Sequence, residues 1–203
     1  MTAEPATDHL VLGREARELL FLAARTPNTF ADVPVSDEQV RAIYDLVKFA
    51  PTSMNQQPLR VVLVRSTRAR RQLLARLHPG NRAKSATAPL IALLVADLNF
   101  HHRLPEVFPH VPKAHELFSD KEARENSAVF NATLQLAYFI IGVRAAGLCA
   151  GPVVGYDEAG IMADFFPWLD RRVLAVLNIG PPGPDPWFPR LPRLSFDDVV
   201  SVA

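Results

Sequence analysis

The 203-residue sequence has little cysteine, little net charge and no long uninterrupted apolar run. Its single cysteine, Cys149, excludes an internal disulfide and a cysteine-based metal cluster, and is typical of a reducing compartment. The 22 Lys and Arg residues nearly balance 21 Asp and Glu, so a net charge of +1 creates no overall attraction to nucleic acid or anionic membrane. The apolar runs 89–96 and 130–146 are too short or too interrupted to cross a bilayer, which takes about 20 residues. We therefore expect a cytoplasmic protein with no membrane and no nucleic-acid partner.

Proline is the residue type in excess, with 18 of 203 residues against an average of roughly 5%. The apolar fraction of 49% and the charged fraction of 21% are those of a globular chain. Because domains typically hold about 100–200 residues, we predict a single domain over residues 1–203. Within it, residues 1–12 are expected to be flexible and residues 181–203 to form a proline-rich C-terminal arm.

Hydrophobic periodicity predicts helices over 14–24, 37–50, 67–77, 122–146 and 157–166, and strands over 60–64, 90–96 and 173–179. Ser36 and Gln39 form a capping-box pattern at the start of the second helix. We expect Pro79 and Gly80 to end the third helix, and the 147–152 segment to be the turn that ends the long fourth one. The strand over 90–96 is apolar throughout, which indicates burial on both faces. The predicted class is α+β.

Several chemical motifs are missing from the sequence. It has no glycine-rich phosphate loop, no Gly-x-Ser-x-Gly elbow and no His-Glu-x-x-His pair. His101, His102, His110 and His115 have no standard metal-ligand spacing, so we expect no metal and a mobile His- and Pro-rich loop over 100–115. Cys149 lies among apolar residues, which favours a buried, inert thiol.

One stretch of the chain is strongly basic, with seven cations and no acid between positions 65 and 84. It could be a nucleic-acid patch, but it has no interleaved aromatic residues for base stacking. A solvated helix face is the interpretation we favour. The seven residues are Arg65, Arg68, Arg70, Arg71, Arg76, Arg82 and Lys84.

The segment 50–58 is the most informative part of the sequence. Between Pro51 and Pro58 it carries two hydroxyls and three amides, namely Thr52, Ser53, Asn55, Gln56 and Gln57. A helix C-terminal turn would explain one or two such residues. Five of them in a proline-bounded loop favour binding of a polar heteroaromatic ligand.

With this segment the sequence resembles the nitroreductase family of FMN-dependent oxidoreductases, where Pro-Ser-Ser-x-Asn-x-Gln-Pro follows the second helix and contacts a flavin held mainly by the partner subunit. Pro51, Thr52, Ser53, Asn55, Gln57 and Pro58 match that motif, with Thr for the first Ser. Three further motifs match in order, at Asn81–Lys84, Pro152–Asp157 and Arg193–Val200. The opening Arg-x-Ser motif is matched only by Arg25 and Thr26.

The resemblance implies an α+β fold with a central, mostly antiparallel sheet flanked by helices, in an interlocked homodimer that shares two FMN sites. It assigns the FMN phosphate to Arg25 and Arg193, with Arg190 as a helper, because a phosphate needs cations. Lys84 would stabilise charge at N1 and the C2 carbonyl, and Asn81 would bond the pyrimidine edge. The backbone at Val154 and Gly155 would donate to N5, the hydride-carrying atom. No side chain is needed as a catalytic nucleophile.

Two positions depart from the family pattern. Pro27 replaces a serine and Thr29 replaces a basic residue, so a contact to the ribityl or phosphate group and one cation near N1 are missing. Val154 stands where a glutamate often precedes the glycine, which matters little because that contact is made by the backbone.

The implied activity is ping-pong reduction through FMN, with NADPH or NADH as reductant. The segments 25–30, 80–84 and 104–110 resemble the branch of the malonic semialdehyde reductase of pyrimidine breakdown, which implies reduction of a small aldehyde to 3-hydroxypropanoate; nitro or quinone compounds remain alternatives. Phe100, His101 and Phe108 are the candidate substrate residues, or else they only pack the dimer. The rival classes are a flavin carrier or flavin-cleaving protein of the same fold and a nucleic-acid module.

Overall fold

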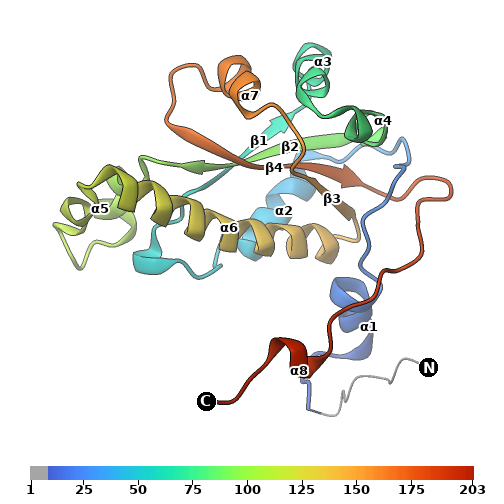
Figure 1. Cartoon of the computed structure of the whole chain (residues 1–203), viewed down its shortest axis with the longest axis horizontal. Helices are drawn as coiled ribbons and strands as arrows, with labels where there is room; N and C mark the ends of the chain where they lie inside the picture. Colours follow the sequence, from blue (N-terminus) through green and yellow to red (C-terminus); the bar gives the residue numbers. More distant parts are fainter. Residues whose placement is uncertain (1–8) are drawn as a thin grey trace.

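A four-stranded antiparallel sheet forms the centre of the computed structural model, which describes residues 9–203. The strand order is β1-β2-β4-β3, with bounds Leu59–Val64 for β1, Leu90–Asp97 for β2, Cys149–Val153 for β3 and Arg171–Gly180 for β4. Figure 1 shows helices on both faces of this sheet. The predicted α+β class and the antiparallel sheet flanked by helices are confirmed.

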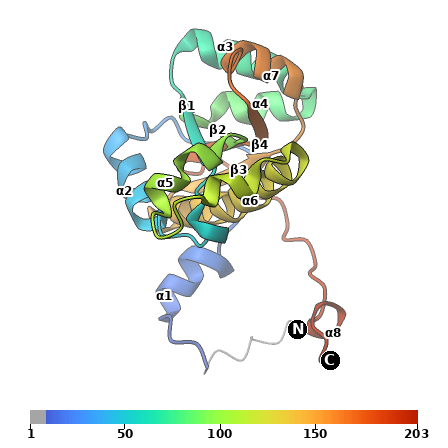
Figure 2. The ribbon, with the colours of Figure 1, turned by 90° about the vertical axis from the view of Figure 1, so that its left-hand side faces the viewer.

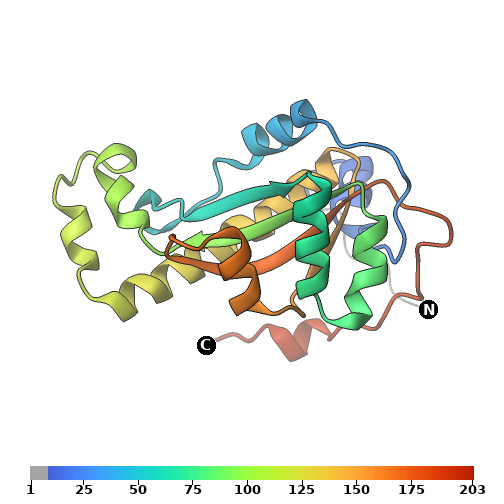
Figure 3. The ribbon, with the colours of Figure 1, turned by 90° about the horizontal axis from the view of Figure 1, so that it is seen from above.

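Strand β2 is buried on both faces, as its continuous apolar sequence predicts. Because side chains alternate across a strand, Ile91, Leu93 and Val95 pack with helices α3 (Thr67–Arg76) and α7 (Glu158–Phe165) on one face. Leu90, Ala92 and Leu94 pack on the other face with α2 (Asp37–Val47) and α6 (Lys121–Ala145). Figure 3 shows the α3 and α7 layer from above.

Helix α2 begins where the sequence predicts. The Ser36 hydroxyl accepts the Gln39 backbone N–H, and the Gln39 side chain accepts the Ser36 backbone N–H. The helix ends at Val47, three residues before the predicted end at Ala50.

Helix α6 is the longest element and matches the predicted 122–146 helix closely. By length and composition it could cross a membrane, unlike the expectation from its interrupted sequence. It packs, however, against α2 and the sheet, as a core helix does. Phe130, Leu134 and Tyr138 remain exposed on it by 65%, 39% and 42%, so one apolar stripe is left uncovered within the chain.

Two elements differ from the sequence prediction. Pro79 and Gly80 do not end a helix; they begin α4 (Pro79–Thr87), because proline is well suited to the first helical position. Part of the expected turn over 147–152 is strand β3, which pairs with β4 at the sheet edge. Pro152 is tolerated there because an edge strand needs fewer backbone donors.

The expected His- and Pro-rich loop is also not a loop. It consists of η3 (Phe100–Arg103), α5 (Leu104–Val107) and η4 (Ala114–Phe118), joined by turns. The Phe100 and Phe118 rings meet edge to face at 4.9 Å inside a small core that the segment shares with α6.

Both ends of the chain stand away from the sheet. Helix α1 (Arg14–Arg17) continues into η1 (Glu18–Leu22), and the C-terminal arm ends in α8 (Phe196–Val199). Figure 2 shows α1 and α8 below the body. Of the residues expected to be flexible, 1–8 lie outside the described residues.

Candidate functional site

Three arginines from opposite ends of the chain line one cavity of about 280 Å³. The Arg25 guanidinium donates to the Phe188 carbonyl and lies 5.4 Å from the Trp187 ring centre. Arg190 donates to the Leu22 carbonyl at 2.6 Å. Arg193, the third, donates to carbonyls of its own arm at 3.0 and 3.1 Å. The structure thus joins Arg25, Arg190 and Arg193 in one basic pocket.

Residues 28–31 hold the first part of the C-terminal arm, residues 181–186. The Asn28 and Ala31 backbone N–H groups donate to Pro186 and Pro181, and the Thr29 hydroxyl donates to Pro184 at 2.6 Å. Thr29, which departs from the family motif, therefore fastens the arm. Pro27, the other departure, is buried.

Arg144 supports the basic pocket from inside. Its guanidinium donates to the Arg25 carbonyl at 2.6 Å and to the Ala150 carbonyl at 3.4 Å, and the residue is only 9% exposed. Burial lowers the pKa of Arg144 and raises that of the neighbouring Cys149, so the thiol form is favoured. Cys149 is buried, as predicted.

A second group lies where α4 meets the turn after β3. The Asn81 side chain donates to the Gly155 carbonyl at 3.3 Å, and the His78 backbone N–H donates to the same oxygen at 3.0 Å. A Cβ at Gly155 would stand 2.8 Å from the Asn81 Nδ2, so a larger residue there would displace the Asn81 side chain. Val154 is 76% exposed, and Lys84 follows on α4. The predicted Asn81, Lys84, Val154 and Gly155 are thus carried by adjoining segments.

The polar segment between Pro51 and Pro58 is a strained loop. Met54, Asn55 and Gln57 all have positive φ, of 51°, 51° and 46°. Such conformations persist only where the surroundings hold them. The Gln57 backbone N–H donates to the Thr52 hydroxyl at 3.3 Å, and the Asn55 amide donates to the Val107 carbonyl at 2.8 Å.

Helix α6 anchors this loop through Asn131. The Asn131 carboxamide oxygen accepts the Ser53 backbone N–H at 2.7 Å, and its nitrogen donates to the Gln56 side chain at 3.1 Å. Gln56 and Asn131 are each 2% exposed. The sequence hinted at this anchor only because Asn131 and Gln135 interrupt an apolar run.

One chain does not bring its own loop to its own basic pocket. The loop precedes β1 at the β2 end that holds Ala96, whereas the arm with Arg190 and Arg193 follows the end of β4, which pairs with the opposite end of β2 at Leu90. Figures 1 and 3 show the loop and the start of the arm toward opposite sides of the molecule along its long axis.

The candidate substrate residues separate in the structure. Phe100 is fully buried and belongs to the core of its segment, so the expectation that it covers a ligand is corrected. His101 is half-buried, with its ring 4.1 Å from that of His102. The half-buried Phe108 ring lies 3.9 Å from that of the exposed His110.

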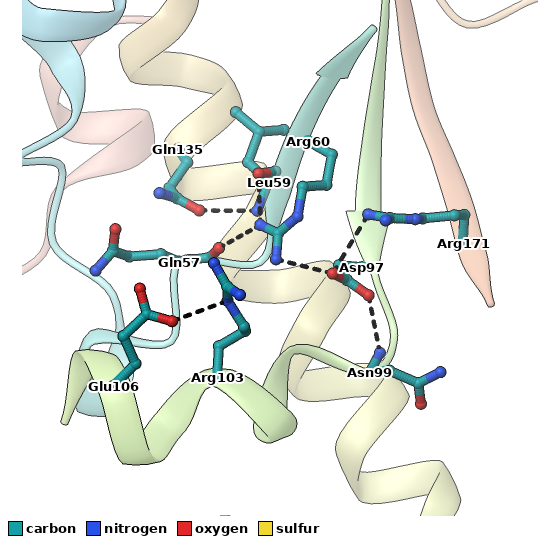
Figure 4. Close-up of polar contacts among 9 residues, drawn as sticks. All are labelled: Gln57, Leu59, Arg60, Asp97, Asn99, Arg103, Glu106, Gln135 and Arg171. Atoms are coloured by element: carbon teal, nitrogen blue, oxygen red, sulfur yellow. Dashed lines mark hydrogen bonds and ion pairs between the residues drawn. The ribbon is translucent and has the colours of Figure 1, made fainter. Parts of the chain in front are cut away.

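A polar cluster that the sequence did not reveal lies beside the loop (Figure 4). Arg60 donates to the Gln57 carbonyl at 2.8 Å and pairs with Asp97 at 2.8 Å, while Arg171 pairs with Asp97 at 3.4 Å. Arg103 and Glu106 face this cluster from η3 and α5.

Four of the seven cations between positions 65 and 84 make contacts within the chain. Arg65 pairs with Asp37, and Arg76 pairs with Asp157 and Asp164. The other two donate to backbone carbonyls. Arg70 donates to the Ala88 carbonyl, which follows α4, and Arg82 donates to the Leu77 carbonyl, which follows α3. The segment is thus mainly structural. Within residues 9–203, no group of three or more His, Cys, Asp or Glu is placed to hold a metal ion.

A family model described as the nitroreductase family matches residues 23–180. The chain belongs to the nitroreductase family. It is 60% identical over 194 residues to a protein of Streptomyces griseus provisionally named NADH dehydrogenase/NAD(P)H nitroreductase, covering 95% of this chain and 98% of the relative. A Polynucleobacter asymbioticus protein of the same name is 41% identical over 192 residues, with the same two coverages.

Among nitroreductase-family folds of known structure, a provisionally named nitroreductase from Exiguobacterium sibiricum, in complex with FMN, superposes with a TM-score of 0.83 at 18% identity. The match covers 94% of this chain and 98% of that one. One from Bacillus subtilis superposes with a TM-score of 0.80, also at 18% identity, over 93% and 99%. These likenesses establish the nitroreductase fold.

Proposed function

We propose that this nitroreductase-family protein is an FMN-dependent NAD(P)H oxidoreductase that works as a homodimer with two shared FMN sites. The names of the curated relatives and the FMN in the related crystal structure support this proposal. The observation that carries it is the basic pocket, which brings Arg25, Arg190 and Arg193 together around space for one anionic group.

The residues suit FMN at both of its ends. The three arginines of the basic pocket supply charge and N–H donors for a phosphate, which arginine binds strongly. At Gly155, the Asn81 amide and the His78 ring occupy the space that a Cβ would take, so the turn presents its backbone beside two polar side chains. We propose that Thr26 and Arg25 lie along the path between the two.

The flavin supplies the hydride chemistry when bound. Lys84 would then provide a positive charge near the pyrimidine side of the ring, where reduction builds negative charge. Asn81 orients the Val154–Gly155 turn through its bond to the Gly155 carbonyl, and it would also hydrogen-bond the ring edge. The backbone N–H of this turn would donate to the ring nitrogen that exchanges hydride.

The homodimer proposal rests on two incomplete surfaces. The loop with Pro51, Thr52, Ser53, Asn55 and Gln57 lies far from the basic pocket of its own chain, so it would complete the site of a partner. The exposed stripe on α6 and the apolar arm provide area for such contact. Exposed side chains on these surfaces include Phe130, Tyr138, Phe188, Leu191, Leu194 and Phe196.

We propose a small aldehyde such as malonic semialdehyde, reduced to 3-hydroxypropanoate, as the substrate, with nitro and quinone compounds as alternatives. The half-buried His101 and Phe108 are the residues that would border it. The single buried thiol agrees with a cytoplasmic location. Alternating addition of NADPH and aldehyde, with flavin absorbance as the readout, distinguishes this enzyme from a flavin carrier.

Intersubunit complementation tests the shared site directly. One chain carries Asn55→Ala and Gln57→Ala, the other carries Arg25→Ala and Arg193→Ala, and two different tags allow the mixed dimer to be purified. Each homodimer should bind FMN weakly, while the mixed dimer should contain one intact site and bind one FMN. No recovery in the mixed dimer, or a monomeric wild-type protein with full activity, would overturn the proposal.

A further inference from the structure

A polar cavity of about 550 Å³ lies beside the loop, on the side facing η3 and α5. Its walls include Gln57 from the loop, Arg60 and Asp97 from the sheet, and His102, Arg103 and Glu106 from the segment that follows β2. We infer that this cavity binds the phosphate-bearing adenylate half of the nicotinamide dinucleotide, an inference that rests on the proposed function.

Some charged groups of the cavity are held by contacts within the chain, and others are available to bind a ligand. Arg60 is held by the Gln57 and Leu59 carbonyls and by Asp97, which also pairs with Arg171. This cluster forms a rigid floor. Arg103 makes one ion pair, to Glu106 at 3.2 Å, and both side chains are more than 60% exposed. Among the described residues, the other N–H groups of the Arg103 guanidinium have no acceptor.

An exposed ion pair of this kind contributes little stability, so an incoming phosphate can replace Glu106 as the partner of Arg103. A phosphate carries more charge than a carboxylate and accepts two parallel bonds from an arginine. His102 is exposed beside Arg103 and can donate to the same group. Tyr44, 57% exposed at the rim, offers a ring face for an adenine base.

Size and position favour the reductant over the aldehyde. The cavity lies in the range of about 300–1,000 Å³ that holds drug-sized ligands, far more than a three-carbon aldehyde fills. It shares Gln57 with the loop that reaches the flavin in our proposal. A dinucleotide with its phosphates at Arg103 can therefore extend its nicotinamide past Gln57 toward the flavin.

The test compares Arg103→Gln with Lys113→Gln in the FMN-containing protein. Lys113 makes a similar exposed pair with Glu116 in the same segment, but it does not line the cavity. Arg103→Gln should raise the KM for NADPH, and the Kd for 2′,5′-ADP by titration calorimetry, about fivefold. Lys113→Gln should change neither. Glu106→Gln should lower both values, because it removes the competing carboxylate.

Reduced nicotinamide mononucleotide, which lacks the adenylate half, is the matched probe. Its KM should be the same in the wild type and in Arg103→Gln. A rise for NADPH alone would place the 2′-phosphate at Arg103, and a rise for NADPH and NADH would place the adenylate phosphate of the diphosphate there. No rise for either, or an equal rise for the mononucleotide, would overturn the inference. If the protein bound no FMN, the proposed function would be wrong. The binding of 2′,5′-ADP would still test the cavity in that case, so the two failures can be distinguished.

Discussion

The Asn131 carboxamide oxygen accepts the backbone N–H of Ser53 at 2.7 Å, across 78 positions of the chain. This bond fixes a loop with three residues of positive φ to the longest helix. The loop conformation is therefore determined by a tertiary contact as well as by its own sequence.

Asn131→Ala should lower the free energy of unfolding by about 2 kcal/mol, because it leaves the Ser53 N–H and the buried Gln56 amide without this partner. It should also weaken FMN binding, since the loop loses its anchor. Urea unfolding and a fluorescence titration with FMN measure the two effects. Thr133→Ala, which removes an exposed hydroxyl on the same helix, is the control and should change neither by much.

Arg193→Ala and Lys84→Ala should differ in whether they mainly change FMN affinity or the rate of flavin reduction. Losing Arg193 should weaken FMN affinity about tenfold or more, as expected for a hydrogen bond to a charged group. Losing Lys84 should slow flavin reduction by NADPH in stopped-flow measurements more than it weakens affinity. Arg68→Ala, on the exposed face of α3, is the control. Small and equal effects of the first two variants would contradict the assigned roles.

Gly155→Ala should strongly impair FMN binding, because its Cβ would stand 2.8 Å from the Asn81 Nδ2 and 3.0 Å from the His78 Nδ1. Gly80→Ala is the matched control on the neighbouring α4, where a Cβ would meet nothing within 4 Å. FMN stoichiometry after purification compares the two. Full occupancy in Gly155→Ala would show that the turn does not border the ring.

His101 should make stability depend on pH. Burial is the main cause that lowers the pKa of His101 from its ordinary 6.5, and the nearby His102 and Arg124 lower it further. The unfolded state then binds more protons just below pH 6.5, so the free energy of unfolding should fall as the pH drops through that value. His101→Gln should flatten this slope, and His110→Gln should not. Urea unfolding at pH 5.5 and 7.5 measures both slopes.

Local signals in the sequence were sufficient to predict most helices and strands of the core. The Ser36–Gln39 capping box and the unbroken apolar run of β2 each specify one element, and both are found as predicted. The prediction that Pro79 ends a helix is wrong, because proline is also well suited to the first position of a helix. Strand β3 was missed because a short strand with glycine and proline exists only through its pairing with β4.

The candidate site was harder to predict, because its geometry depends on contacts between distant parts of the chain. The roles of Arg25, Arg190 and Arg193 came from a family resemblance, and the structure adds that they share a pocket. The cluster of Arg60, Asp97 and Arg171 has no local pattern, since strand pairing alone brings it together.

The basic pocket also joins parts of the chain that lie on either side of the sheet in the sequence. Arg25 precedes the first strand, whereas Arg190 and Arg193 follow the last one on the C-terminal arm. An anion bound to all three arginines would clamp the arm to the segment before α2. In the proposed function FMN would therefore act as a strut between two distant segments, because a ligand that binds only the assembled pocket stabilises it.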